Sequence, residues 1–370
     1  MASLAASLAS LRVDQRRLAK RTGLSRTRVA EIFAGSSPNG RELRLIAEYL
    51  RIPADSLVKS ETRPRSDVRF RKTPRKNPPL ATEARTQEIA SFLSENNLVS
   101  RSAAPSPRFS ADLQDRPSIE RAADSIRQLI CANGEHLDPL PDLAARIDRA
   151  GLASSIVLHD LGIEGASTNI NGKGLIVIAA RTFSPRMLFT CAHELAHVVL
   201  GHTESGNWLM DEDTIEAFDA DHEEERLCNA LASALLQPAE GVARFLQTVR
   251  RQFQIPQGAL TATEALLVAR YYGTSFFASV MRLEYLEIAP AGTAASFEHA
   301  IKANHKSPES YAEQMGLPPR VRVDMPAISP VLGKSIAIAV EEGDISVGRV
   351  ADVLGYSVIE ISDALTRSDH

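Results

Sequence analysis

The stretch FTCAHELAHVVLGH, from Phe189 to His202, determines the architecture of the largest part of this chain. It places His193 and His197 four positions apart, so on a helix both imidazoles project from one face and can bind one metal ion. Glu194 lies between them. Zinc held by the two histidines would lower the pKa of a water molecule, and Glu194 is placed to take that proton as a general base. The motif therefore predicts a zincin-type site, with zinc as cofactor and a peptide bond as target.

A catalytic zinc needs a third protein ligand and an open position for water. The metzincin arrangement is excluded, because it requires a third histidine six residues after His197 and Thr203 stands there. Downstream, the segment EERLCNALASALLQP offers Glu225 and Asn229 four positions apart on one face of a second helix. Glu225 is the candidate third ligand, and Asn229 is the candidate that orients a ligand by hydrogen bonding. Three neighbours stay open as alternatives to Glu225: His222, Glu223 and Glu224.

Taken together, these two segments resemble the ImmA/IrrE family of metallopeptidases. The resemblance rests on FTCAHELAHVVLGH and on the pattern E-x-x-x-N-x-x-A-x-x-L-L-x-P at Glu225–Pro238, and it extends over Ile119–Ile288. It implies a zinc-binding helix, a second helix that supplies the carboxylate ligand, and cleavage of a partner DNA-binding repressor. Cys228, Leu231 and Gln237 depart from the family's pattern, and we interpret them as packing changes that leave the ligands intact.

Two β-like runs, SSIVLHDL and GLIVIAA, precede the motif and are separated by a polar turn. The β-branched residues of Ile156–Leu158 and Leu175–Ile178 suit a small antiparallel sheet. Helical patterns surround these runs, at Ile119–Cys131, Leu140–Ala150 and Pro185–Leu286. The predicted fold class is therefore α+β, with a zincin-like metallopeptidase domain made of a small sheet and active-site helices.

Charge is distributed unevenly along the chain, although the formal net charge is only −4. Residues 1–80 contain 18 Lys and Arg against 7 Asp and Glu, a net charge of +11, so the remainder carries −15. A basic first part joined to an acidic remainder indicates that nucleic acid is bound at one end only.

The basic part includes DQRRLAKRTGLSRTRVAEIFAG, which has the rhythm of a helix-turn-helix. Gly23 lies at the turn, Ser25 is the expected N-cap, and Val29 and Ile32 are expected in the core. With the later helix in RELRLIAEYLRIPADSL, this all-α unit resembles the XRE/Cro-type repressor domain. The resemblance implies binding of double-stranded DNA by four residues: Gln15 near phosphates, and Arg26, Thr27 and Arg28 at the exposed start of the recognition helix.

Composition shifts give the expected domain boundaries. Residues 1–58 form the helix-turn-helix domain and 59–118 a basic, Pro/Ser-rich linker with a short helix. Residues 119–288 form the peptidase domain, and 289–370 a helical C-terminal regulatory or interaction segment. In that last segment Ser346 is expected to cap one helix and Gly355 to end it.

Membrane-spanning proteins are excluded, because no apolar run approaches the roughly 20 residues that a bilayer requires. Three cysteines without a CxxC pair argue against a disulfide framework. We therefore expect a cytoplasmic protein, and the pattern leaves homo-oligomerisation open.

The leading hypothesis is a zinc metalloendopeptidase and transcriptional regulator that cleaves a partner repressor or antitoxin. The alternative is a DNA-binding transcription factor whose peptidase-like domain is a sensor that cuts nothing. Glu194 favours the first hypothesis, since a pure sensor has no need of a general base.

Overall fold

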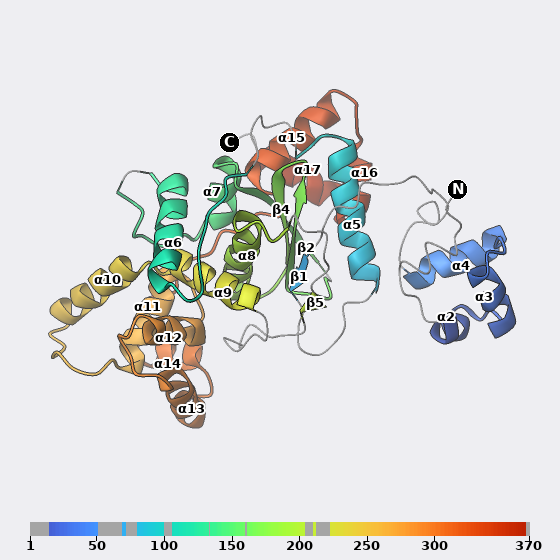
Figure 1. The fold of residues 1–370 in the computed structure, drawn as a ribbon. Coiled ribbons are helices and arrows are strands. Elements are labelled where there is room, and N and C mark those ends of the chain that lie inside the picture. Colours follow the sequence, from blue (N-terminus) through green and yellow to red (C-terminus); the bar gives the residue numbers. More distant parts are fainter. Residues whose placement is uncertain are drawn as a thin grey trace.

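A computed structural model gives the arrangement of the chain (Figure 1). It describes residues 15–50, 69–71, 80–99, 106–132, 134–159, 161–203, 210–211 and 223–367. Within these ranges the chain is α+β, as predicted: helices cover a single mixed sheet, and a small helical unit precedes it. Among the same residues, no helix combines the length and the apolar character needed to cross a bilayer.

Three helices make up the described part of the N-terminal unit: α2 (Gln15–Thr22), α3 (Arg26–Phe33) and α4 (Gly40–Leu50). They enclose a small core of their own, in which Leu18, Val29 and Ile32 are fully buried. Ser25 caps α3 as expected, because its hydroxyl accepts a hydrogen bond from the backbone N–H of Arg28. The helix-turn-helix pattern in the sequence is thus confirmed in these residues.

The sheet has the strand order β2-β4-β3-β1-β5. Its strands are β1 (Arg69–Arg71), β2 (Ala153–Leu158), β3 (Gly165–Ile170), β4 (Lys173–Ala179) and β5 (Met210–Asp211). Strand β2 pairs with β4 in parallel, with Ala153 opposite Gly174, and β3 pairs with β4 antiparallel. Strand β1 extends the sheet antiparallel to β3, and β5 pairs with β1 in parallel.

The expectation of a small antiparallel sheet holds for β3 with β4 and for β1 with β3, but the two runs identified in the sequence lie in β2 and β4, which pair in parallel. The segment between them is not only a polar turn, because it contains β3, which lies on the far side of β4. Asn171 and Gly172, both with positive φ, join β3 to β4 in a two-residue hairpin. The chain therefore passes from β2 to the far side of β4 and returns through the hairpin, which makes β2 and β4 parallel.

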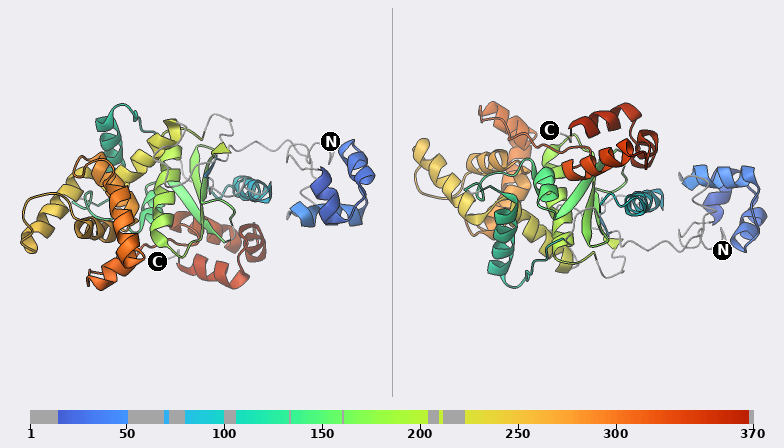
Figure 2. Two further views of the ribbon diagram at one scale, coloured as in Figure 1. Left: turned by 90° about the horizontal axis from the view of Figure 1, so that it is seen from below. Right: turned by 90° about the horizontal axis from the view of Figure 1, so that it is seen from above.

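Both faces of the sheet are covered (Figure 2). Along β4, Ile176 and Ile178 face the core formed with α6 (Arg116–Ile130), α7 (Leu143–Arg149), α8 (Ser184–Val199) and α9 (Glu223–Leu236). Leu175 and Val177 point the opposite way, as the two-residue period of a strand requires, and enter a second core. This explains why every residue of β4 is buried.

Helices that precede and follow the sheet strands β2–β4 in the sequence supply the second core. They are α5 (Leu80–Glu95) and the C-terminal helices α15 (Pro330–Glu341), α16 (Val347–Leu354) and α17 (Val358–Arg367). Asp148 of α7 fastens α15, since its carboxylate accepts hydrogen bonds from the backbone N–H groups of Val331 and Leu332. Ser346 caps α16 and Gly355 ends it, as predicted. The C-terminal helices are therefore part of the body of the fold.

A third core joins five further helices. They are α10 (Ala239–Gln252), α11 (Ala262–Tyr272), α12 (Phe276–Tyr285), α13 (Thr293–His305) and α14 (Pro308–Gln314). Helices α11 and α12 follow each other closely in the chain, and Phe276, Val280 and Leu283 of α12 are buried. Gln237, before α10, donates hydrogen bonds to the hydroxyls of Thr274 and Ser279. Packing thus engages the face of α12 that carries these apolar residues.

Candidate metal centre

Helices α8 and α9 lie against each other and carry the candidate ligands. Helix α8 begins with Pro185 in its first turn, which suits a position whose N–H has no helical partner, and it buries both faces. One turn of this helix separates His193 from His197, so the two imidazoles lie together. Glu225 lies in the first turn of α9, where the helix dipole favours negative charge.

Three side chains converge between the helices. The Nε2 atoms of His193 and His197 lie 3.1 Å apart, and Glu225 places one carboxylate oxygen 3.0 Å from the first and the other 2.9 Å from the second. A tetrahedral zinc with bonds of about 2.0–2.1 Å would set its donor atoms roughly 3.3 Å apart. Two nitrogens and a carboxylate at this spacing fit zinc in both chemistry and size.

Asn229 fixes the protonation of the first ligand. Its side-chain oxygen lies 2.9 Å from Nδ1 of His193, and an amide oxygen can only accept a hydrogen bond. Nδ1 of His193 therefore carries the proton, which leaves the Nε2 lone pair free to bind a metal. Asn229 is brought to this place by its four-residue spacing from Glu225 on α9.

The electrostatics of the cluster favour an added positive charge. Burial by itself lowers the pKa of His197, but the neighbouring Cys228 and the carboxylate of Glu225 outweigh burial and raise it well above the usual value. Burial likewise opposes ionisation of Glu225, yet the imidazoles of His197 and His193 hold its pKa well below the usual range. A carboxylate and two buried imidazoles thus form a cage that attracts a proton or a metal cation.

Glu194 points from α8 toward the sheet. One of its carboxylate oxygens accepts a hydrogen bond of 2.7 Å from the hydroxyl of Ser167 on β3, and both residues are buried. Gly165, two positions earlier on β3, lets the strand come this close, because a Cβ there would lie 2.5 Å from Thr190 and 3.1 Å from Glu194. Ser167 is not apparent as a site residue from the sequence, because only the register of β3 brings it to α8.

Other histidine, glutamate and tyrosine side chains near these segments lie outside the cage of three ligands. Glu223 is exposed at the start of α9, and Glu224 is partly exposed beside it. His202 contacts His197 on the side of Nδ1. The hydroxyl of Tyr272 donates a hydrogen bond to the backbone carbonyl of Leu137. His222 lies outside the described residues.

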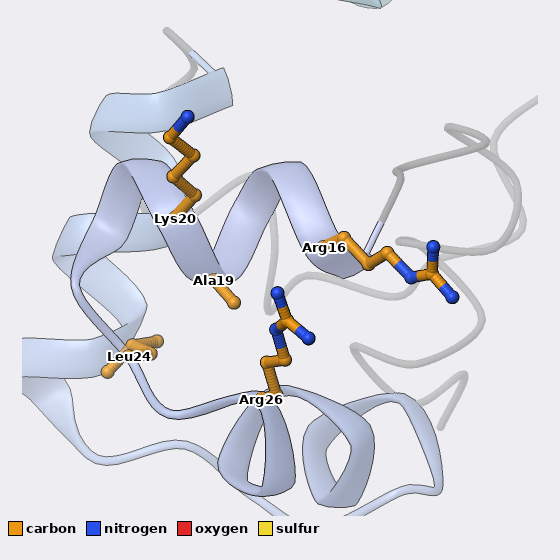
Figure 3. A pocket seen from close by; sticks show the side chains of 5 residues that line it. All are labelled: Arg16, Ala19, Lys20, Leu24 and Arg26. Atoms are coloured by element: carbon orange, nitrogen blue, oxygen red, sulfur yellow. The ribbon is translucent and has the colours of Figure 1, made fainter.

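On the N-terminal unit, the structure places Gln15, Arg26 and Thr27 at exposed positions, with Gln15 at the start of α2 and the others at the start of α3. Figure 3 shows a groove between these helices, into which the guanidinium of Arg26 points from α3. Arg16 and Lys20 line the same groove from α2. These three cations suit the phosphates of DNA.

Arg28 differs from its neighbours because its guanidinium is engaged within the unit. It donates to both carboxylate oxygens of Glu42 at 2.9 and 3.0 Å, to Glu31 at 3.0 Å, and to the carbonyl of Ser37 at 3.0 Å. The hydrogen bond with Glu42 is the main cause that raises the pKa of Arg28. In this arrangement Arg28 ties α3 to the start of α4.

Comparison with known proteins gives two family matches. The model of a peptidase family, described as the IrrE N-terminal-like domain, matches residues 156–284, a stretch that includes α8 and α9. The helix-turn-helix family matches residues 8–57. A comparison with curated proteins gives no match.

Proposed function

From the presence of an IrrE N-terminal-like peptidase domain at residues 156–284 and a helix-turn-helix DNA-binding domain at residues 8–57, we propose that this chain is a zinc-dependent endopeptidase that regulates transcription. Its substrate is a partner protein, a repressor or an antitoxin. The convergence of His193, His197 and Glu225 beside Glu194 is the observation that carries the proposal.

The zinc would be held by His193, His197 and Glu225. When bound, it acts as a Lewis acid and lowers the pKa of a water molecule. Glu194 takes a proton from the attacking water and returns it to the nitrogen of the leaving amine. Ser167 supports this role, because its hydrogen bond holds one carboxylate oxygen of Glu194 and so fixes the orientation of the carboxyl group. Asn229 supports it from the other side by holding His193 in the tautomer that binds metal.

The DNA-binding domain would keep the peptidase near regulators that occupy DNA. Gln15, Arg26 and Thr27 are exposed, and the groove between α2 and α3 adds Arg16 and Lys20. Contacts with phosphates provide affinity at any sequence, while the start of α3 is the part that reads bases. Arg28 is proposed to contribute to this surface by holding α3 in place.

The experiment is cleavage of any DNA-binding regulator that is encoded beside this chain's gene. Zinc-loaded wild type is expected to give two fragments by mass spectrometry, and Glu194→Gln none, although it keeps its zinc. His299→Ala, an exposed change on α13, serves as the control and should cut like wild type. If zinc-loaded wild type leaves the regulator intact, the peptidase proposal fails and the non-cleaving sensor replaces it.

A further inference from the structure

The two candidate histidine ligands have different partners on the side away from the metal cage. Nδ1 of His193 faces the amide oxygen of Asn229, but Nδ1 of His197 faces Nδ1 of His202 at 3.3 Å. For Nε2 of His197 to bind a cation, the ring proton must sit on Nδ1, and that proton needs an acceptor. The lone pair of His202 Nδ1 can accept it when His202 carries its own proton on Nε2.

We propose that His202 is a positioning residue, which fixes the tautomer and the ring plane of the zinc ligand His197. This inference rests on the proposed function, because it presumes that His197 holds zinc. The rings of the two histidines meet edge to face, with centroids 5.4 Å apart and planes at 66°. Rotation of His197 away from Glu225 would break the contact with His202.

The end of α8 is built to bring His202 to this place. Gly201 has φ +84°, and the backbone N–H of His202 donates to the carbonyl of His197 itself at 3.0 Å. This is the hydrogen bond of a Schellman turn, in which a left-handed glycine reverses the chain at a helix end. The turn carries the side chain of His202 back over the ring of the residue five positions earlier.

Cys228 closes the cluster from α9. Its sulfur lies 3.5 Å from Nδ1 of His202, and its side chain is fully buried. Glu225, Cys228 and Asn229 are spaced three and four positions apart, so one face of α9 supplies a ligand, the contact to His202 and the partner of His193. His202 is thereby held between the end of α8 and the second ligand helix.

A direct role of His202 in the reaction fits this arrangement less well. Its Nδ1 faces Nδ1 of His197, whereas Glu225 approaches His197 at Nε2, on the other edge of the ring. A hydrogen-bond donor to the reacting carbonyl must reach the Nε2 side, where the metal and substrate would lie. His202 therefore acts on the reaction through His197.

Zinc affinity, measured by competition with a chromophoric chelator, tests the proposal without any cleavage assay. In the full chain, His202→Ala is expected to weaken zinc binding by about 10–100-fold, as changes of a ligand's hydrogen-bond partner typically do. The visible absorption of the cobalt-substituted protein should shift as well, since the ligand field depends on how His197 is held. His202→Asn keeps an acceptor, so it should recover most of the affinity, and exposed His299→Ala should change neither value.

Gly201→Ala tests the proposal in a second way. It keeps His202 in the sequence but strains the left-handed turn that positions its side chain. It should weaken zinc binding in the same direction, which keeps the test decisive if His202→Ala does not fold. Unchanged affinity and an unchanged cobalt spectrum in folded His202→Ala, or in Gly201→Ala, would overturn the inference while the zinc site stands. A wild type that binds no zinc would instead overturn the proposed function.

Discussion

Ser167 and Glu194 show how one side chain on the sheet can control a group on the helix. The hydroxyl of Ser167 donates to the carboxylate at 2.7 Å in a buried setting. Ser167→Ala should lower kcat for cleavage about tenfold, since a hydrogen bond to a charged group contributes roughly 1.5 kcal/mol. KM and zinc content should stay unchanged. Exposed Ser362→Ala is the control, and an unaltered kcat in Ser167→Ala would show that the base needs no such support.

Arg28 and Arg16 should behave differently toward DNA, although both are cations of the same small unit. Arg28 is engaged by Glu42 and Glu31, whereas Arg16 lines the open groove beside Lys20. The salt dependence of binding to double-stranded DNA separates the two cases, because its slope counts the phosphates that are neutralised. Arg16→Ala should reduce the slope by about 0.9, and Arg28→Ala should leave it unchanged. An equal reduction of the slope in Arg28→Ala would mean that Arg28 contacts a phosphate.

Spacing along single helices predicted two pairs of residues in the candidate site. His193 and His197 share one helix face, as do Glu225 and Asn229, and a four-residue interval can be read directly from the sequence. Ser167 could not be found in this way, because its contact with α8 depends on strand register.

At the scale of elements, the close approach of β3 to α8 depends on a single missing side chain. A Cβ on Gly165 would meet Thr190 at 2.5 Å, so Gly165→Ala should destabilise the chain by about 1–3 kcal/mol through overpacking. Gly258 is the matched control, because a Cβ there would meet nothing within 4 Å. Chemical denaturation measures both changes. Equal midpoints for the two variants would contradict the packing described between strand and helix.

The sheet was harder to predict than the helices around it. Helices α6 and α7 lie where their patterns indicated, within a few residues. The parallel pairing of β2 with β4 was not predicted, because β-branched content marks strands without saying which neighbours pair. Asn171 and Gly172 did carry a hairpin signal, and reading it would have placed Gly165–Ile170 beside β4. Likewise, the C-terminal helices have an apolar face whose partner is not apparent from local pattern alone.

For the whole molecule, burial of both sheet faces makes α15–α17 necessary to the fold. Ile336, Val350 and Ile361 lie in the same core as β2, β3 and β4. Deletion of residues 330–370 should expose that core and yield an aggregated or unfolded product, judged by circular dichroism and size-exclusion chromatography. Deletion of residues 1–58 should instead leave the rest of the chain folded, because the N-terminal helices have a separate core. A folded, zinc-binding chain without residues 330–370 would show that these helices are only an appendage.

The central claim is that His193, His197 and Glu225 together hold one zinc ion. Elemental analysis of the purified full chain tests it most directly, with His193→Ala, Glu225→Ala and Glu194→Gln measured beside wild type. We predict about one zinc per chain in wild type and in Glu194→Gln, and clear loss in the two ligand variants. Wild type without zinc, or undiminished zinc in both His193→Ala and Glu225→Ala, would contradict the account.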